Sequence, residues 1–220
     1  KFDPAFRTQD DYWTILRTHL MVPVYNTKKV KEEDVPKSWK DFLDPKWKGR
    51  LVNANPNYSG AATVQMIYIV RLFGLDFYEK LAKLKPKIIS AGSGIPAFVA
   101  GGEADLALGG TSYSIIRGVN KGEPLKMAFP KEGVPNAVSP NSLLKKAPHP
   151  NAAKVFIDYL FSFKTQQYLA DNGLYVGHPA VKYPPSIPPL DRIKTVIISP
   201  AEIKKKNKIM RKKFRKLFGV

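Results

Sequence analysis

The sequence of 220 residues contains no cysteine. This excludes disulfide bonds, zinc sites built on thiolates and cysteine nucleophiles. It also lacks any apolar run near the roughly 20 residues that a membrane-spanning helix needs, and it shows no internal repeat. The chain starts at Lys1 without a signal-type apolar segment, so we expect that any targeting segment has been removed or was never included. What remains is an ordinary globular composition, 44% apolar and 11% aromatic, long enough for one large domain or two lobes.

Acidic residues are scarce, with 18 Asp and Glu against 36 Lys and Arg and a net charge of +18. The excess is uneven, because residues 192–220 carry 11 basic side chains and a single acidic one, Glu202. Ser199, Pro200 and Glu202 predict the start of a terminal helix with a capping box. An apolar stripe along that helix leaves its lysines on a solvated face. Basic helices also bind nucleic acid or anionic lipid, but here no aromatic residues alternate with the basic ones to stack on bases.

Strands and helices alternate through the first part of the chain. Three times, a short apolar strand is followed by a turn of small or polar residues that opens a helix. These units are Leu51–Ala54 with the helix 60–73, Ile88–Ser90 with a helix ending near Gly101, and Asp105–Leu108 with a helix through Val119. In an open α/β sheet such turns gather at one sheet edge, where ligands bind. The pattern therefore predicts a shared binding edge.

The first of these turns ends in Ser59, Gly60 and Ala61. Serine is a preferred N-cap, and glycine leaves the N–H groups of the first helical turn sterically open. Unpaired amides at the positive end of the helix dipole predict an anion-binding site. The alternative interpretation is an ordinary helix cap.

Hydroxyl side chains occupy the second and third turns: Ser93, Thr111, Ser112 and Tyr113. Each can donate a hydrogen bond to an anion, and Tyr113 can cover an apolar or sugar-like group. Each hydroxyl can equally make a local cap or turn bond. Ser139 and Asn141, in a returning extended segment, are weaker candidates that would line the site from the hinge side. Arg117, one helical turn after Tyr113, would reach the ligand or form a surface salt bridge.

Residues typical of catalysis or metal binding do not form a recognisable motif. His19, His149 and His178 are far apart in sequence and lack metal-ligand spacing. No nucleophile–base motif and no phosphate loop of the nucleotide-hydrolase type occurs. We therefore expect a protein that is not an enzyme and that carries no metal or cofactor.

Several longer phrases, spread in order along the chain, resemble one family. They are Val24–Thr27, Pro36–Arg50, Asn55–Gly60, Ala100–Asp105 and Lys145–Ala153. The chain resembles a bacterial extracellular solute-binding protein of an ABC importer, in the ferric-binding-protein-like branch. The resemblance implies an α/β fold, the two-lobed clamp of periplasmic binding proteins. It also implies a missing N-terminal portion, so that one lobe is complete and only the C-terminal part of the other is present.

On this resemblance we divide the chain into three segments. Residues 1–22 would form the hinge and crossover, 23–125 the complete ligand-binding lobe, and 126–220 the return crossover and helical C-terminal part of the other lobe. The implied location is periplasmic, or extracellular with a membrane tether through a removed N-terminus. The implied partner is an ABC transporter permease.

The resemblance also bears on the ligand. Relatives hold a phosphate with backbone N–H groups at the turn that here reads Ser59-Gly60-Ala61. Iron-binding relatives place two adjacent tyrosines where this chain has Ser112-Tyr113, so we expect a phosphorylated or carboxylated organic anion rather than ferric ion. The alternatives are a ferric-ion transport protein with altered ligands, nucleic-acid binding through the basic terminal helix, and an enzyme reusing the fold.

Overall fold

The computed structural model describes Phe6 and residues 12–220. The strands are β1 (Thr14–Asn26), β2 (Leu51–Ala54), β3 (Lys87–Ile89), β4 (Leu106–Thr111), β5 (Leu125–Met127), β6 (Val134–Asn141) and β7 (Thr195–Ile197). The α-helices are α1 (Gly60–Phe73), α2 (Asp76–Lys83), α3 (Ile95–Ala100), α4 (Ser112–Asn120), α5 (Pro150–Leu160), α6 (Phe163–Asp171) and α7 (Pro200–Phe218). Short 3₁₀ turns, including Gly92–Gly94 and Trp39–Leu43, connect them. The predicted α/β class is confirmed.

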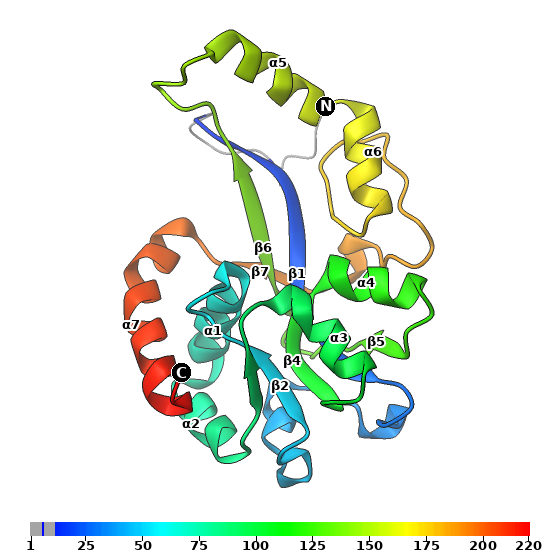
Figure 1. Cartoon of the computed structure of the whole chain (residues 1–220), viewed down its shortest axis with the longest axis vertical. Helices are drawn as coiled ribbons and strands as arrows, with labels where there is room; N and C mark the ends of the chain where they lie inside the picture. Colours follow the sequence, from blue (N-terminus) through cyan, green and yellow to red (C-terminus); the bar gives the residue numbers. More distant parts are fainter. Residues whose placement is uncertain (1–5, 7–11) are drawn as a thin grey trace.

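One mixed sheet organises the molecule, with strand order β3-β2-β4-β1-β6-β7 and β5 also paired to β1. β2 runs parallel to both β3 and β4, whereas β1 is antiparallel to β4, β5 and β6. The 13-residue β1 pairs with β4 through its second half and with β6 through its first half. β1 therefore runs through both parts of the molecule (Figure 1).

The larger part, which we call the body, contains β2–β5 and helices α1–α4. β2 and β4 are buried at every residue, as expected for parallel strands covered on both faces. α1 buries eight consecutive residues, Ala62–Ile69, across the sheet. The hydroxyl of Tyr68 donates to the carbonyl of Glu132 at 2.7 Å, and the indole of Trp39 donates to the carbonyl of Gly133 at 2.9 Å. These two bonds tie the start of β6 to the body.

α7 packs on the body. Met210 and Phe214 are buried, and the Phe214 ring centroid lies 6.1 Å from that of Tyr78 in α2. Ser199 caps the helix by accepting the Glu202 N–H at 3.2 Å. The Glu202 carboxylate binds Lys206 at 2.7 Å, so the structure shows the serine half of the predicted capping box. The three-segment division stays a prediction, and these contacts favour grouping α7 with the body.

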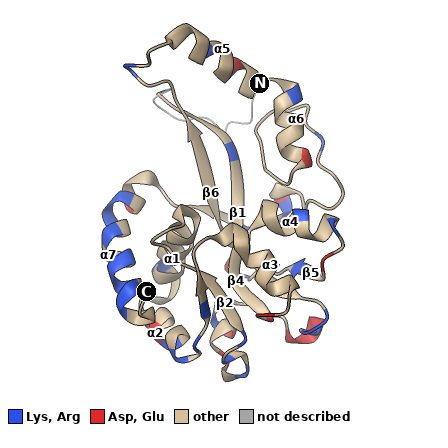
Figure 2. Cartoon of the chain, viewed as in Figure 1, with Lys and Arg blue, Asp and Glu red and all other residues tan. Residues whose placement is uncertain are grey.

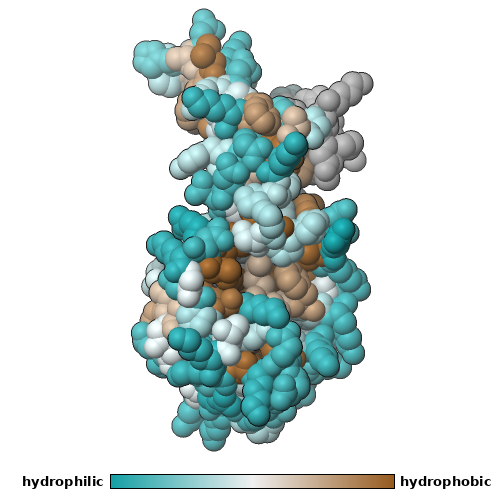
Figure 3. All heavy atoms as spheres, turned by 90° about the vertical axis from the view of Figure 1, so that its right-hand side faces the viewer, coloured by the Kyte–Doolittle hydropathy of each residue, from teal (hydrophilic) through white to brown (hydrophobic). Residues whose placement is uncertain are grey.

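The smaller part, which we call the arm, consists of the first half of β1, the end of β6, and helices α5 and α6. Figure 3 shows it standing away from the body above a narrower junction. α5 has no buried residue, and Val155, Phe156 and Tyr159 are exposed. Within the described residues, no single helix has the length and apolar composition to cross a membrane, although α1 and α2 together do, with a bend of 109° between them.

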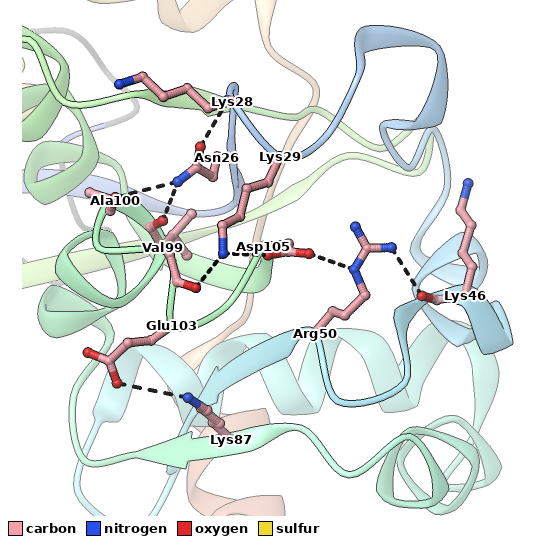
Figure 4. A network of polar contacts seen from close by, with 11 residues as sticks. Asn26, Lys28, Lys29, Lys46, Arg50, Lys87, Val99, Ala100, Glu103 and Asp105 are labelled. Carbon is pink, nitrogen blue, oxygen red and sulfur yellow. Dashed lines mark hydrogen bonds and ion pairs between the residues drawn. The ribbon is translucent and has the colours of Figure 1, made fainter.

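A polar network closes the body at the end opposite to the carboxyl ends of its parallel strands (Figure 4). Asp105, just before β4, pairs with Arg50 at 2.6 Å and Lys29 at 3.5 Å. The Asn26 side chain donates to the carbonyl of Val99 at 2.8 Å, and Lys29 donates to the carbonyl of Gly102 at 2.6 Å. Residues of the segment Ala100–Asp105 thus join the end of β1 to the starts of β2 and β4, and their role is structural.

Candidate functional site

The three predicted turns lie at one edge of the sheet. β2, β3 and β4 are mutually parallel, so their carboxyl ends point the same way. The amide of Asn55 after β2 donates to the carbonyl of Ile89 in β3 at 2.7 Å. A Cβ on Gly92, after β3, would lie 3.7 Å from the Thr111 methyl at the end of β4. The first turn thus touches the second strand, and the second turn touches the third, as the alternating pattern predicts.

The turn after β2 presents backbone donors. The Ser59 side chain accepts the Ala62 N–H at 3.2 Å, so its oxygen serves as the helix cap. The amides of Gly60 and Ala61 come first in α1, where an α-helix supplies no acceptor for them. Gly60 is exposed, and a Cβ there would meet no atom within 4 Å. Two N–H groups at the positive end of a 14-residue helix are therefore open to a ligand.

The turn after β4 uses most of its hydroxyl groups internally. Thr111 and Ser114 share a hydrogen bond of 2.7 Å. The Ser112 hydroxyl is fully buried and accepts the amide of Leu20 in β1 at 3.1 Å. The local-bond alternative therefore describes the Thr111 side chain, whereas the Ser112 hydroxyl binds the distant strand β1. The bond from Leu20 to Ser112 fastens the start of α4 to the hinge strand.

Tyr113 contacts two side chains, those of His19 and Arg117. Its ring meets the His19 ring edge-on, with centroids 5.7 Å apart. The Arg117 guanidinium lies over the Tyr113 ring, 5.5 Å from its centroid. Burial lowers the pKa of His19 to about 4, and the nearby charge of Arg17 acts in the same direction. His19 is therefore a neutral imidazole, and its buried Nδ1 has no partner within the described part of the chain.

The remaining predicted residues divide into two groups. Ser93 is exposed in the 3₁₀ turn Gly92–Gly94, close to the shared edge. Ser139 and Asn141 lie on β6 in the arm, opposite Arg17 and Thr14. Leu20, which binds Ser112, pairs with Asn136. At about 3.4 Å per residue, Ser139 lies roughly 10 Å and Asn141 roughly 17 Å further along the strand. The structure does not bring these two to the turns.

Sequence reasoning missed Asn55 as a site residue. Its buried side chain accepts both the Asn57 amide N–H at 2.9 Å and the Asn57 Nδ2 at 2.8 Å. This Asx turn sets the loop that delivers Ser59 and Gly60. The Asn-Pro-Asn sequence is a turn signal that indicates it. His19 carried no such signal, because its contact with Tyr113 joins residues far apart in the sequence.

No group of three or more His, Asp or Glu side chains suited to a metal ion occurs in the part of the chain that the structure describes. The site offers backbone N–H groups, hydroxyls and an aromatic ring. This donor set suits hydrogen bonding to an anion.

The chain has clear relatives. The major ferric iron-binding protein of Neisseria meningitidis serogroup A is 28% identical over 205 residues, which cover 88% of this chain and 61% of that protein. The periplasmic binding protein AfuA from Actinobacillus pleuropneumoniae, solved with exogenous fructose-6-phosphate bound, superposes with a TM-score of 0.84 at 21% identity. This match covers 100% of this chain and 73% of AfuA. Iron-bound HitA from Pseudomonas aeruginosa gives 0.81 at 24% identity, covering 97% and 72%.

These likenesses place the fold among the two-lobed periplasmic binding proteins. The chain spans about 50–61% of the length of curated relatives that it matches. The family model described as bacterial extracellular solute-binding protein matches residues 2–196. The chain belongs to this family.

Proposed function

We propose that the protein is the solute-binding receptor of an ABC importer, periplasmic or extracellular, and that it captures a small phosphorylated or carboxylated organic anion. The observation that carries this proposal is the pair of open amides at Gly60 and Ala61, at a sheet edge shared by three turns. Anion binding at a helix N-terminus needs only such amides and the helix dipole. AfuA, a structural relative, was solved with a sugar phosphate.

The strength of such a site follows from its donors. A hydrogen bond to a charged group contributes roughly 1.5–3 kcal/mol. Two amides and one hydroxyl would give a gross value of about 5–9 kcal/mol, close to the roughly 8 kcal/mol of a micromolar site. The entropy lost on capture reduces that sum. We therefore expect weak binding to the body alone, with further contacts supplied by closure of a second lobe.

A ferric-ion receptor is the second candidate, since relatives are named for iron binding. The contact between Tyr113 and His19 supplies one phenol and one imidazole for such a site. We place it second because Ser112, which stands beside Tyr113, is fully buried and already bound to Leu20. A visible absorption band on addition of ferric citrate would reverse this order.

The first experiment is a thermal-shift screen with phosphate esters, phosphonates, carboxylates and ferric salts. A compound that raises the melting temperature is then titrated calorimetrically against two variants at one position. Gly60→Pro removes the first amide donor of α1, and proline is favoured at this helical position. The extended backbone of Ser59 (φ −123°, ψ 114°) suits a following proline. Gly60→Ala keeps the donor and is the matched control.

We expect Gly60→Pro to weaken binding roughly 10- to 150-fold, because one charge-assisted hydrogen bond is lost. Gly60→Ala should bind like the parent chain, because a Cβ meets no atom within 4 Å. Equal affinities for all three chains would show that the Gly60 amide does not hold the ligand. If no compound of the screen stabilises the protein, the receptor proposal loses its main support.

A further inference from the structure

A second group of donors surrounds a cavity beside the loop that precedes α1, and neither Gly60 nor Ala61 lines this cavity. The cavity has a volume of about 410 Å³ and lies between this loop and the second half of α7. Asn55, Asn57 and Tyr58 line it from the loop, so the cavity shares Asn55 with the first site. Asn207, Lys208, Arg211 and Arg215 line it from α7. The three cations are spaced by three and four residues, so they lie on one helix face.

Arg211 is held in place by the body. Its Nε and Nη2 both donate to the Thr63 hydroxyl oxygen, each at 3.4 Å. Thr63 donates in turn to the carbonyl of Pro56 at 2.8 Å, which ties the guanidinium to the loop. Arg211 is half-buried, whereas Lys208 and Arg215 are exposed, as are Lys212 and Lys213, which do not line the cavity. This arrangement fixes one cation at the cavity wall instead of leaving it free on the helix surface.

The positive charges around the cavity lack a counter-charge. Over Phe6 and residues 12–220, no ion pair joins Lys208, Arg211 or Arg215 to an acidic side chain. Val220 also borders the cavity, and counting a terminal carboxylate there still leaves an excess of two positive charges. A partly buried cation is stabilised by an anion, so the lining is suited to a ligand that brings one.

We propose that this cavity binds the phosphate group of a phosphorylated compound, as an anion site separate from Gly60 and Ala61. Arg211 and Arg215 lie one helical turn apart, and each guanidinium can form paired hydrogen bonds with phosphate oxygens. The volume falls in the range of small-molecule sites. The Tyr58 ring, 77% exposed, is available to cover the organic part of the ligand.

The helix that supplies the cations of this cavity lies outside the part of the chain that the family model matches. The family model ends at residue 196, and all the cations of the cavity belong to α7. Figure 2 shows that basic residues also occur along the length of α7. A general attraction of anions to this helix is therefore the alternative that the experiment has to separate from a built site.

The experiment uses inorganic pyrophosphate as the probe, titrated calorimetrically at about 0.15 M salt. All chains carry Gly60→Pro, which weakens the other proposed site. The test variant is Arg211→Gln with Arg215→Gln, and its control is Lys212→Gln with Lys213→Gln, which removes the same charge from exposed positions. We expect the test variant to bind at least tenfold more weakly and the control to stay within about twofold, since two paired contacts are lost only in the first.

Two further measurements keep the proposal testable. Arg215→Gln alone spares the bond between Arg211 and Thr63, so it should weaken binding without a fall in melting temperature. Vesicles of phosphatidylcholine with phosphatidylglycerol test a lipid headgroup as the source of the phosphate. Vesicle binding lost only in the arginine variant would assign the site to headgroups. The proposal is overturned if the arginine and lysine variants lose affinity equally, or if neither pyrophosphate nor the vesicles bind. Either result counts whatever the effect of Gly60→Pro on the first site.

Discussion

His19 shows how one buried side chain links the hinge strand to the candidate site. It lies on β1, one residue before the Leu20 amide that binds Ser112, and its ring touches Tyr113. Burial and the charge of Arg17 hold its pKa at about 4, well below its ordinary value of 6.5. Because the unfolded chain binds a proton between these two values and the folded chain does not, stability must fall as the pH drops through this window.

We therefore predict that the free energy of unfolding decreases from pH 6.5 to pH 4.5. The full difference between a pKa of 6.5 and one of about 4 corresponds to at most about 3 kcal/mol. His19→Gln should remove most of this dependence, whereas His149→Gln, at an exposed position, should retain it. Urea unfolding at several pH values provides the measurement. Glu32 and Asp34, whose pKa is lowered by hydrogen bonds from Lys126 and Lys46, also lose stability in acid, but they are present in every chain, so the difference between the pH profiles isolates His19. A His19→Gln chain that keeps the parent pH profile would contradict the assignment.

At the scale of elements, the sequence predicts best where one local signal suffices. Residues Leu51–Ala54 and Gly60–Phe73 are predicted and observed with the same limits, because an apolar run and a serine cap define them locally. The first half of the 13-residue β1 has no such local signal, because it is stabilised by β6, more than a hundred residues later. β7 has three residues and is paired with β6, so its own sequence gives little indication of a strand.

The site shows the same difference between features with a local sequence signal and features that depend on long-range contacts. The convergence of the three turns follows from the order of strands and helices and could be predicted. The internal use of the Ser112 and Thr111 hydroxyls depends on Leu20 and Ser114 in the folded chain. The pairing of His19 with Tyr113 likewise depends on the packing of α4 on β1. The sequence therefore indicates where the site lies better than it indicates which side chains are free to bind.

The contact between α4 and the segment after α6 offers a test at this scale. Gly173 has φ +83°, and a Cβ there would lie 3.1 Å from the Tyr113 Cα and 3.2 Å from the Ile116 Cβ. Gly122 has a similar φ of +80° but open space around it. We predict that Gly122→Ala costs about 1–2 kcal/mol from backbone conformation. Gly173→Ala should cost roughly 1–3 kcal/mol more from overpacking.

Denaturant unfolding of both variants provides this measurement. Near-ultraviolet circular dichroism would also change in Gly173→Ala, since Tyr113 has to move. Equal losses of stability in the two variants would mean that the segment after α6 does not pack on α4 as the structure shows.

At the scale of the whole molecule, packing is distributed unequally between the body and the arm. The body contains the large buried aromatic residues Trp39, Trp47, Tyr68 and Tyr78. In the arm, α5 buries none of its residues, and α6 buries Gln166 and Ala170. The two parts are joined by the pairing of β1 with β6 and by the contact of Gly173 with Tyr113. Regions with few buried contacts open locally at a low free-energy cost.

We predict that hydrogen exchange separates these parts. The amides of α5 should exchange fastest of the three helices, because none of its residues is fully buried and local opening exposes little additional apolar surface. α6 should be intermediate, and Ala62–Ile69 in α1 should exchange only on global unfolding, since all eight residues are buried. Mass spectrometry of peptides after timed deuteration resolves the three groups. Equal protection of α5 and α1 would show that the arm and the body unfold as one cooperative unit. In that case the arm would not move independently of the body in the proposed closure on a ligand.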